Sequence, residues 1–385
     1  MKLFKRILLG IFSLVVLVIG IGAIFLKTSP QFGGEASEED RARYAKTGHY
    51  NGEIFLNEEE IVMEINCHSI TQMIKEFWEP DPQVAPKEEI AVQQITPQTL
   101  IEKPDSLVRL TWFGHSTFLV EINGMNLLLD PIFGQVAAPH PLLGRKRFNS
   151  QMPISINDLP PIDAIIISHD HYDHLDYPSI NQLKNKTEHF FVPMGVENHL
   201  ESWDIAPERI HSLDWWEETT FKGLTIACTP SRHMSGRAFG DQSATLWGSW
   251  VIKDSTTNIY FSGDGGYGRH FKKIGERYGP FDIGLMECGQ YNVLWKHVHM
   301  MPEETVMAGQ DVKAKMIVPI HWGSFILATH SWIDPALRVT KKASEVGMPI
   351  STPRIGEPIV LGAHDFPHSR WWEAYEDSGN LHSSN

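Results

Sequence analysis

Cysteine is scarce in this chain, which has only Cys67, Cys228 and Cys288 in 385 residues. Three cysteines cannot build a disulfide framework, and these do not fall at the short spacings of a cysteine zinc site. A long run of Lys and Arg is also missing, and 33 basic residues face 47 acidic ones, for a net charge of −14. This balance argues against a nucleic-acid surface, so we expect no nucleic-acid partner.

A long apolar run lies near the N-terminus. From Ile7 to Leu26 there is no charged residue, and Lys2, Lys5 and Arg6 precede the run. As a helix, about 20 residues span about 30 Å, the thickness of a bilayer core. A cleaved secretory signal is the alternative, but bulky side chains stand where cleavage needs small ones. We expect residues 1–27 to be a single-pass membrane anchor, with the N-terminus cytoplasmic and the catalytic domain on the non-cytoplasmic side.

Two segments carry weaker patterns. Residues 28–104 predict a stalk and an accessory segment, in which 61–78 form an amphipathic helix. Such a stripe usually faces a core, and contact with lipid is the alternative. Residues 363–385 predict a loose C-terminal tail, although Trp371 and Trp372 lie in it.

Residues 105–362 show the pattern of a single large α/β domain. Asn123-Gly124 between two apolar segments favours a type I′ hairpin. Further strands are predicted near 163–168, 188–193, 224–229, 245–253, 258–262, 282–287, 315–320 and 357–361. Helices are predicted near 177–185, 302–313 and 335–346. Two groups of strands with helices between them fit a β-sandwich that helices cover on both outer faces.

The densest group of metal-binding side chains is His169-Asp170-His171-Tyr172-Asp173-His174, directly after an apolar strand. In extended backbone, residues i and i+2 point to the same side, so His169 and His171 can hold one cation. Asp173 and His174 lie beyond a bend and would serve a second cation. A His-rich surface tract is the alternative, but this group does not lie in a low-complexity segment.

Three later strands also end in a metal-binding residue: His233, Asp264 and His321. Strand ends of a covered sheet meet at one edge, so these side chains can converge on the first group. The complete set assigns one metal to His169, His171 and His233. It assigns the other metal to Asp173, His174 and His321, with Asp264 as the bridge.

This ligand set predicts hydrolytic chemistry. Two divalent cations share a water and lower its pKa, so a metal-bound hydroxide acts as the nucleophile. Asp173 and Asp264 are therefore the predicted catalytic residues, and no Ser or Cys nucleophile is required. Imidazole and carboxylate ligands suit Zn²⁺ first, with Mn²⁺ or Fe as alternatives.

These residues resemble those of metallo-β-lactamase-fold hydrolases. Within that family the chain is most similar to the branch of N-acylphosphatidylethanolamine-hydrolysing phospholipase D and its bacterial relatives, and more distantly to the ascorbate-6-phosphate lactonase group. The motifs that carry the closer likeness are Trp112-Phe113-Gly114-His115-Ser116, Leu129-Asp130-Pro131, Ser168 to Asp176, and Pro319-Ile320-His321-Trp322-Gly323. The resemblance implies an αββα sandwich, to which the N-terminal transmembrane helix is added.

Five further residues are candidates for roles around the metals. His115 resembles a family position near the site, and a structural role is the alternative. Asp130 would orient a metal-bound imidazole, or else cap the turn before Pro131. The other three, which would contact substrate or line the pocket, are Gln290, Tyr291 and His299.

Three functions remain open at this point. The resemblance and the anchor favour a phosphodiesterase of phospholipase D type that acts on N-acylphosphatidylethanolamine-like membrane lipids. The alternative enzyme is a lactonase or carboxylic-ester hydrolase of a small polar molecule. A metal-dependent binding protein is the non-enzymatic reading. A homodimer is compatible with each.

Overall fold

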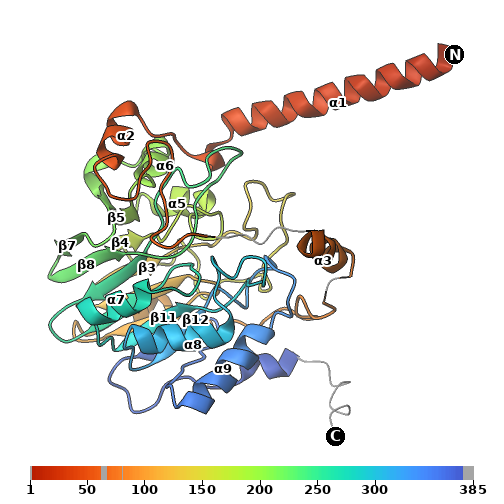
Figure 1. The fold of residues 1–385 in the computed structure, drawn as a ribbon. Helices are drawn as coiled ribbons and strands as arrows, with labels where there is room; N and C mark the ends of the chain where they lie inside the picture. Colours follow the sequence, from red (N-terminus) through yellow and green to blue (C-terminus); the bar gives the residue numbers. More distant parts are fainter. Residues whose placement is uncertain (1, 62–66, 80, 376–385) are drawn as a thin grey trace, which may run out of the picture.

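Two β-sheets form the centre of the molecule (Figure 1). The structure is a computed structural model that describes residues 2–61, 67–79 and 81–375. The first sheet has the strand order β13-β1-β2-β3-β4-β5-β6. Its strands are β1 (Arg109–Trp112), β2 (Phe118–Ile122), β3 (Met125–Leu129), β4 (Ile162–Ile166), β5 (Thr187–Pro193), β6 (Ile210–Leu213) and β13 (Pro358–Val360).

The second sheet has the strand order β12-β11-β10-β9-β8-β7. Its strands are β7 (Glu218–Phe221), β8 (Leu224–Thr229), β9 (Ser249–Lys253), β10 (Asn258–Phe261), β11 (Ile283–Glu287) and β12 (Ile317–Ile320). The predicted hairpin is confirmed in the first sheet, where β2 pairs antiparallel with β3. Asn123 and Gly124 both have positive φ, as a type I′ turn requires.

Helices cover the outer face of each sheet, which gives the expected αββα order (Figure 1). Apolar side chains of both inner faces form one core, and each outer face forms its own core with helices. The first sheet is covered by α5 (Tyr177–Leu183) and α6 (Glu197–Ser202), and the second by α7 (His270–Arg277), α8 (Pro302–Asp311) and α9 (Asp334–Val346).

Trp250 joins the two sheets close to the metal-binding motif. Its side chain is fully buried on β9 in the central core, and its indole N–H donates to the carbonyl of Ile167 at 2.8 Å. Ile167 lies just before the segment 169–174. Replacing a buried Trp by Ala typically costs about 3–5 kcal/mol of stability, so this contact both stabilises the sandwich and positions that segment.

The N-terminal helix α1 (Lys2–Thr28) extends away from the sandwich and has no buried residue (Figure 1). It is long and apolar enough to cross a membrane. The segment after it is not a free stalk. The indole of Trp203 donates to the carbonyl of Pro30 at 2.7 Å, and Arg237 donates to the carbonyl of Gln31 at 2.8 Å. The chain continues through η1 (Pro30–Phe32), α2 (Glu38–Tyr44) and α4 (Pro97–Ile101).

Two expectations were wrong. The amphipathic helix is present as α3 (Cys67–Trp78), and residues 62–66 of the predicted helix lie outside the described residues. The expectation that its apolar stripe faces a core was wrong for Ile70, Ile74 and Trp78, which share one face and are exposed. In the segment predicted as a loose tail, Trp371–Tyr375 form η3, and Trp371 and Trp372 are buried against Trp322. Residues 376–385 lie outside the described residues.

Candidate metal centre

The strand ends of both sheets bring the predicted metal-binding residues together. The segment 169–174 follows β4, and His115 follows β1. From the second sheet, the contributing residues are His233 after β8, Asp264 after β10 and His321 after β12. Each of these side chains is almost fully buried except those of His171 and Asp173, which are partly open to solvent.

Three imidazoles form the first group, which we call the three-histidine cluster: His169, His171 and His233. His169 Nε2 lies 2.9 Å from His171 Nδ1, and His233 Nε2 lies 3.3 Å from the same atom. Ligand nitrogens about 2.0–2.1 Å from a tetrahedral zinc are about 3.3 Å apart. These separations therefore fit three ligands of one ion, the set predicted from the spacing of His169 and His171 and from the strand end at His233.

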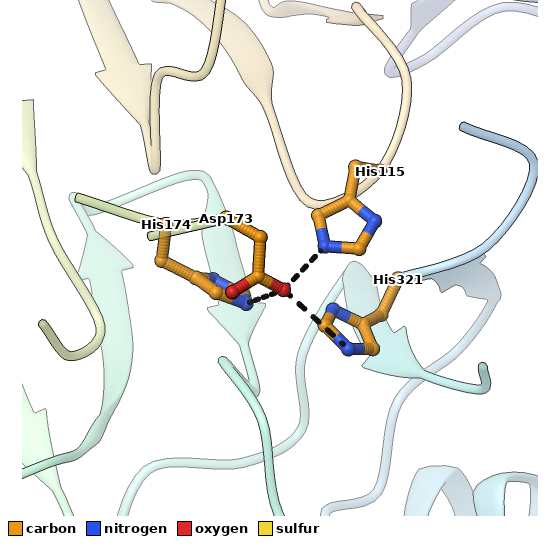
Figure 2. Close-up of side chains that lie close together, drawn as sticks. All are labelled: His115, Asp173, His174 and His321. Atoms are coloured by element: carbon orange, nitrogen blue, oxygen red, sulfur yellow. Dashed lines mark hydrogen bonds and ion pairs between the residues drawn. The ribbon is translucent and has the colours of Figure 1, made fainter. Parts of the chain in front are cut away.

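The second group, the carboxylate cluster, contains His115, Asp173, His174 and His321 (Figure 2). Asp173 Oδ2 is its centre and lies 2.8 Å from His115 Nε2, 3.4 Å from His174 Nε2 and 3.9 Å from His321 Nε2. Three of the four were predicted to hold the second metal. His115 was predicted only for a role around the metals, yet its imidazole lies inside the cluster.

Asp264 lies between the two clusters. Its Oδ2 is 3.2 Å from His174 Nε2 and 3.9 Å from both His169 Nε2 and His233 Nε2. Its Oδ1 is 3.1 Å from His321 Nδ1. One carboxylate thus reaches imidazoles of both groups, which is the arrangement that a bridging ligand needs.

A buried network fixes the orientation of the imidazoles. Asp130 Oδ2 accepts from His174 Nδ1 at 2.7 Å, and this leaves His174 Nε2 facing Asp264. Asp130 also accepts from the backbone N–H and the hydroxyl of Ser168, whose oxygen lies 2.9 Å from His169 Nδ1. His233 Nδ1 faces the carbonyl of Val298 at 2.9 Å. Such contacts set which ring nitrogen is free to bind a metal.

The pKa of His174 is shifted in the opposite direction from those of the three-histidine cluster. Burial, together with the neighbouring imidazoles, holds the pKa of His169 well below the ordinary value, and burial does the same for His233. Burial also acts on His174, but Asp264, Asp173 and Asp130 outweigh it and raise its pKa well above the ordinary value. In the same way His174 outweighs burial and lowers the pKa of Asp173 and Asp264. The three-histidine cluster therefore offers neutral imidazoles. The carboxylate cluster combines the raised pKa of His174 with the charge of Asp173, whereas burial holds the pKa of its His321 well below the ordinary value.

These features fit divalent cations. Among the described residues, the buried atoms His174 Nε2 and Asp264 Oδ1 make no hydrogen bond of good geometry, although other ligand atoms of the site lie close to both. Buried polar atoms normally have partners, and a coordinated ion would satisfy both. The donors are imidazole nitrogens and carboxylate oxygens, which suit zinc and also manganese or iron.

The remaining predicted residues separate into two kinds. His299 lies beside both clusters, 15% exposed, with its Nδ1 3.3 Å from Glu287 Oε1. The hydroxyl of Tyr291 donates to Asp334. The amide of Gln290 donates to the carbonyl of Phe325 and accepts from the N–H of Leu327. Neither contact involves the two clusters, so a role of these two residues in the pocket stays a prediction.

Glu287 is a site residue that sequence reasoning missed. It ends β11, is fully buried, and accepts from the backbone N–H of Met300 at 2.9 Å. Burial raises its pKa to about 7. Its signal in the sequence was a lone carboxylate at the end of an apolar strand, the same pattern that identified Asp264.

A family model described as "Beta-lactamase superfamily domain" matches residues 125–322, which hold both clusters except His115. The chain belongs to the metallo-β-lactamase superfamily. It is thus a metal-dependent hydrolase of that superfamily, as the resemblance implied.

Similar proteins of the metallo-β-lactamase superfamily include an uncharacterised protein of Mycobacterium tuberculosis, 41% identical over 66% of this chain and 69% of the relative. An N-acyl-phosphatidylethanolamine-hydrolyzing phospholipase D of Caenorhabditis elegans is 34% identical over 57% of this chain and 65% of its own length. An isothiocyanate hydrolase from Delia radicum gut bacteria shares the fold, with a TM-score of 0.51, 24% identity and coverage of 66% of this chain and 100% of that chain.

Proposed function

We propose that this protein is a dinuclear phosphodiesterase of phospholipase D type that acts on N-acylphosphatidylethanolamine-like lipids. The observation that carries the dinuclear part is the position of Asp264, whose carboxylate reaches imidazoles of both clusters. The likeness to a phospholipase D of that specificity supports the substrate class. The apolar helix α1 supports a substrate that resides in a membrane.

Different residues would bind the two ions and position the ligands. When bound, two divalent cations supply a shared water of lowered pKa and neutralise charge on the phosphate. The three-histidine cluster would hold one ion, and Asp173, His174 and His321 the other, with Zn²⁺ preferred. Asp264 would set the spacing between them. His115 lies against Asp173 Oδ2 and would keep that carboxylate in place.

His299 would contact the substrate. It is the partly exposed imidazole beside both clusters, and Glu287 lies against its Nδ1. That contact, with Asp264 and Asp173 nearby, outweighs burial and raises the pKa of His299 above the ordinary value. A protonated imidazole at the opening would bind a phosphate oxygen or give a proton to the departing alkoxide.

The localisation that we propose follows from α1. Lys2, Lys5 and Arg6 would stay on the cytoplasmic side, and the sandwich would lie on the other side of the membrane. Carbonate extraction of host membranes tests this, and a fully soluble protein would contradict an uncleaved anchor.

The decisive experiment is a substrate screen of the full chain, loaded with Zn²⁺ in detergent. The substrates are N-acylphosphatidylethanolamine, bis-p-nitrophenyl phosphate and a panel of lactones. We expect phosphatidic acid and N-acylethanolamine from the lipid. In ¹⁸O-labelled water the label should enter the phosphate, because the attack is at phosphorus. Turnover of lactones alone would refute the proposal and favour the carboxylic-ester alternative.

A further inference from the structure

An ordered finger projects from the loop between β3 and β4. Val136 and Lys146 form an antiparallel bridge that closes it, and the N–H of Arg147 donates to the carbonyl of Gln135 at 2.9 Å. At the tip, the N–H of Leu143 donates to the carbonyl of His140 at 2.9 Å. We call residues 136–146 the finger. Backbone hydrogen bonds thus close the finger at its base and form a turn at its tip.

The tip combines apolar and basic side chains. Leu142 is 87% exposed and Leu143 is 64% exposed. Arg145 and Lys146, which follow after Gly144, are also exposed. The finger contains no acidic residue, although the chain carries 47 of them. Two large apolar side chains held in water by an ordered turn indicate a binding surface.

The finger lies beside the point where α1 meets the sandwich. The ring of Phe25, near the end of α1, is 5.9 Å from the ring of His140. In Figure 1 the loop between β3 and β4 rises on the side from which α1 leaves. Another exposed apolar side chain, Phe239, is 93% exposed in a loop that lines a cavity with Leu26 and Lys27.

We propose that the finger inserts its tip into the lipid surface that α1 crosses. Leu142 and Leu143 would enter the boundary between headgroups and acyl chains, and Arg145 and Lys146 would lie against anionic headgroups. The charge supports this partner, because a basic tip on an acidic protein is attracted to an anionic lipid surface and the remaining surface is repelled. The proposal rests on α1 as a retained anchor and does not depend on the substrate.

The base of the finger connects the membrane contact to the metal centre. Arg147 donates to the carbonyls of Ile132 and Phe113 at 3.2 and 3.3 Å, and its guanidinium lies 5.3 Å from the ring centre of Phe325. The same ring is 5.3 Å from that of His115. A single helix can tilt in the bilayer, so a second contact at the lipid surface would fix the direction in which the site opens.

The test measures the depth of the tip in a bilayer. The full chain, with its N-terminus shown to be intact, is placed in nanodiscs of phosphatidylcholine with or without phosphatidylglycerol. A nitroxide is attached at Leu142→Cys in a Cys67→Ser background, since Cys228 and Cys288 are buried. Power saturation with oxygen and a nickel chelate then gives the depth. In anionic discs we expect an immersion of about 5–10 Å, as for other interfacial segments.

Two variants serve as controls. A label at Lys341→Cys, an exposed position on α9 away from α1 in Figure 1, should stay in water. The double substitution Arg145→Gln and Lys146→Gln should bring the label at 142 back toward water. Aqueous accessibility at 142 in both lipid mixtures would overturn the proposal. So would spin–spin broadening between labels, because it would assign the tip to a contact between two copies of the chain.

Discussion

The two clusters of the metal centre use different means to attract a cation. The three-histidine cluster has three imidazoles, and its own members include no carboxylate. In the carboxylate cluster, Asp173, Asp264 and Asp130 act together on His174 and raise its pKa. Under the proposed dinuclear arrangement, the three-histidine cluster would bind its ion mainly through neutral imidazoles, and the carboxylate cluster would bind its ion mainly through negative charge. Asp264 would be the ligand that both ions share.

The largest effect should come from Asp264, because its loss removes what joins the clusters. In Asp264→Asn we expect both ions to be bound weakly and turnover to fall about 1000-fold, since two cations contribute several kcal/mol to lowering the barrier. Metal content is measured by mass spectrometry and turnover on bis-p-nitrophenyl phosphate. The exposed Asp365→Asn is the matched control. Full metal content with full turnover would remove Asp264 from the site.

Substitution of one ligand in each cluster tests the two proposed metal sites separately. His171→Ala should remove the ion of the three-histidine cluster, and His321→Ala should remove the ion of the carboxylate cluster. Each should cost about 100-fold or more in turnover, since even an outer partner of a metal ligand costs 10–100-fold. Metal content should fall from two ions to one per chain in both variants.

Anomalous diffraction shows which ion remains. The same ion lost from both variants would mean that the clusters are one site. His171 is partly exposed, so His171→Ala should leave the fold intact, and thermal unfolding of the metal-free protein provides that control.

Much of the fold could be predicted because its local patterns agree with its contacts. The hairpin at Asn123-Gly124 and the predicted helix near 335–346 follow turn and capping rules that act over a few residues. The strand β7 (Glu218–Phe221) could not be predicted from the sequence, because its side chains do not alternate regularly between buried and exposed. It forms by pairing with β8. Trp371 looked like part of a tail because its partner Trp322 is distant in sequence.

In the candidate site, too, some residues could be predicted from local sequence and others could not. Residues close together in one short segment, such as His169 and His171, could be predicted as metal ligands from their spacing alone. His115 and Glu287 enter the site only because two sheets bring their strand ends to one edge. The position of Tyr291 after a strand could not predict its partner, because Asp334, which accepts from its hydroxyl, lies on α9, distant in sequence.

Substitution of Asp130 should have a smaller effect, and only on metal binding at the carboxylate cluster. It accepts from His174 Nδ1 and has no contact with His171 or His233 among the described hydrogen bonds. Asp130→Asn should therefore weaken metal binding about 10-fold at the carboxylate cluster, the lower end of the effect of outer partners. Titration with a competing chelator in the His171→Ala background isolates that ion. An equal loss at both clusters would show that Asp130 acts through Ser168 on His169 as well.

The smallest expected effect is the number of protons released when an ion binds. It tests directly whether the two clusters differ in charge. In the metal-free chain at pH 7, His174 keeps its proton because its pKa is raised, whereas His169 and His233 stay neutral. The stability that protonated His174 adds is full below about pH 6.5, the ordinary histidine value, and is lost as the pH rises through its raised pKa. An ion that enters the carboxylate cluster must displace this proton.

We therefore expect His171→Ala, which keeps that cluster, to release about one proton per ion bound at pH 7. His321→Ala, which keeps the three-histidine cluster, should release almost none. Calorimetry in two buffers of different ionisation enthalpy measures the release. The affinity of the carboxylate cluster should rise with pH until His174 loses its proton in the free protein. Equal proton release from both variants would mean that the clusters do not differ in charge. It would contradict the hypothesis that one cluster binds metal through neutral imidazoles and the other through negative charge.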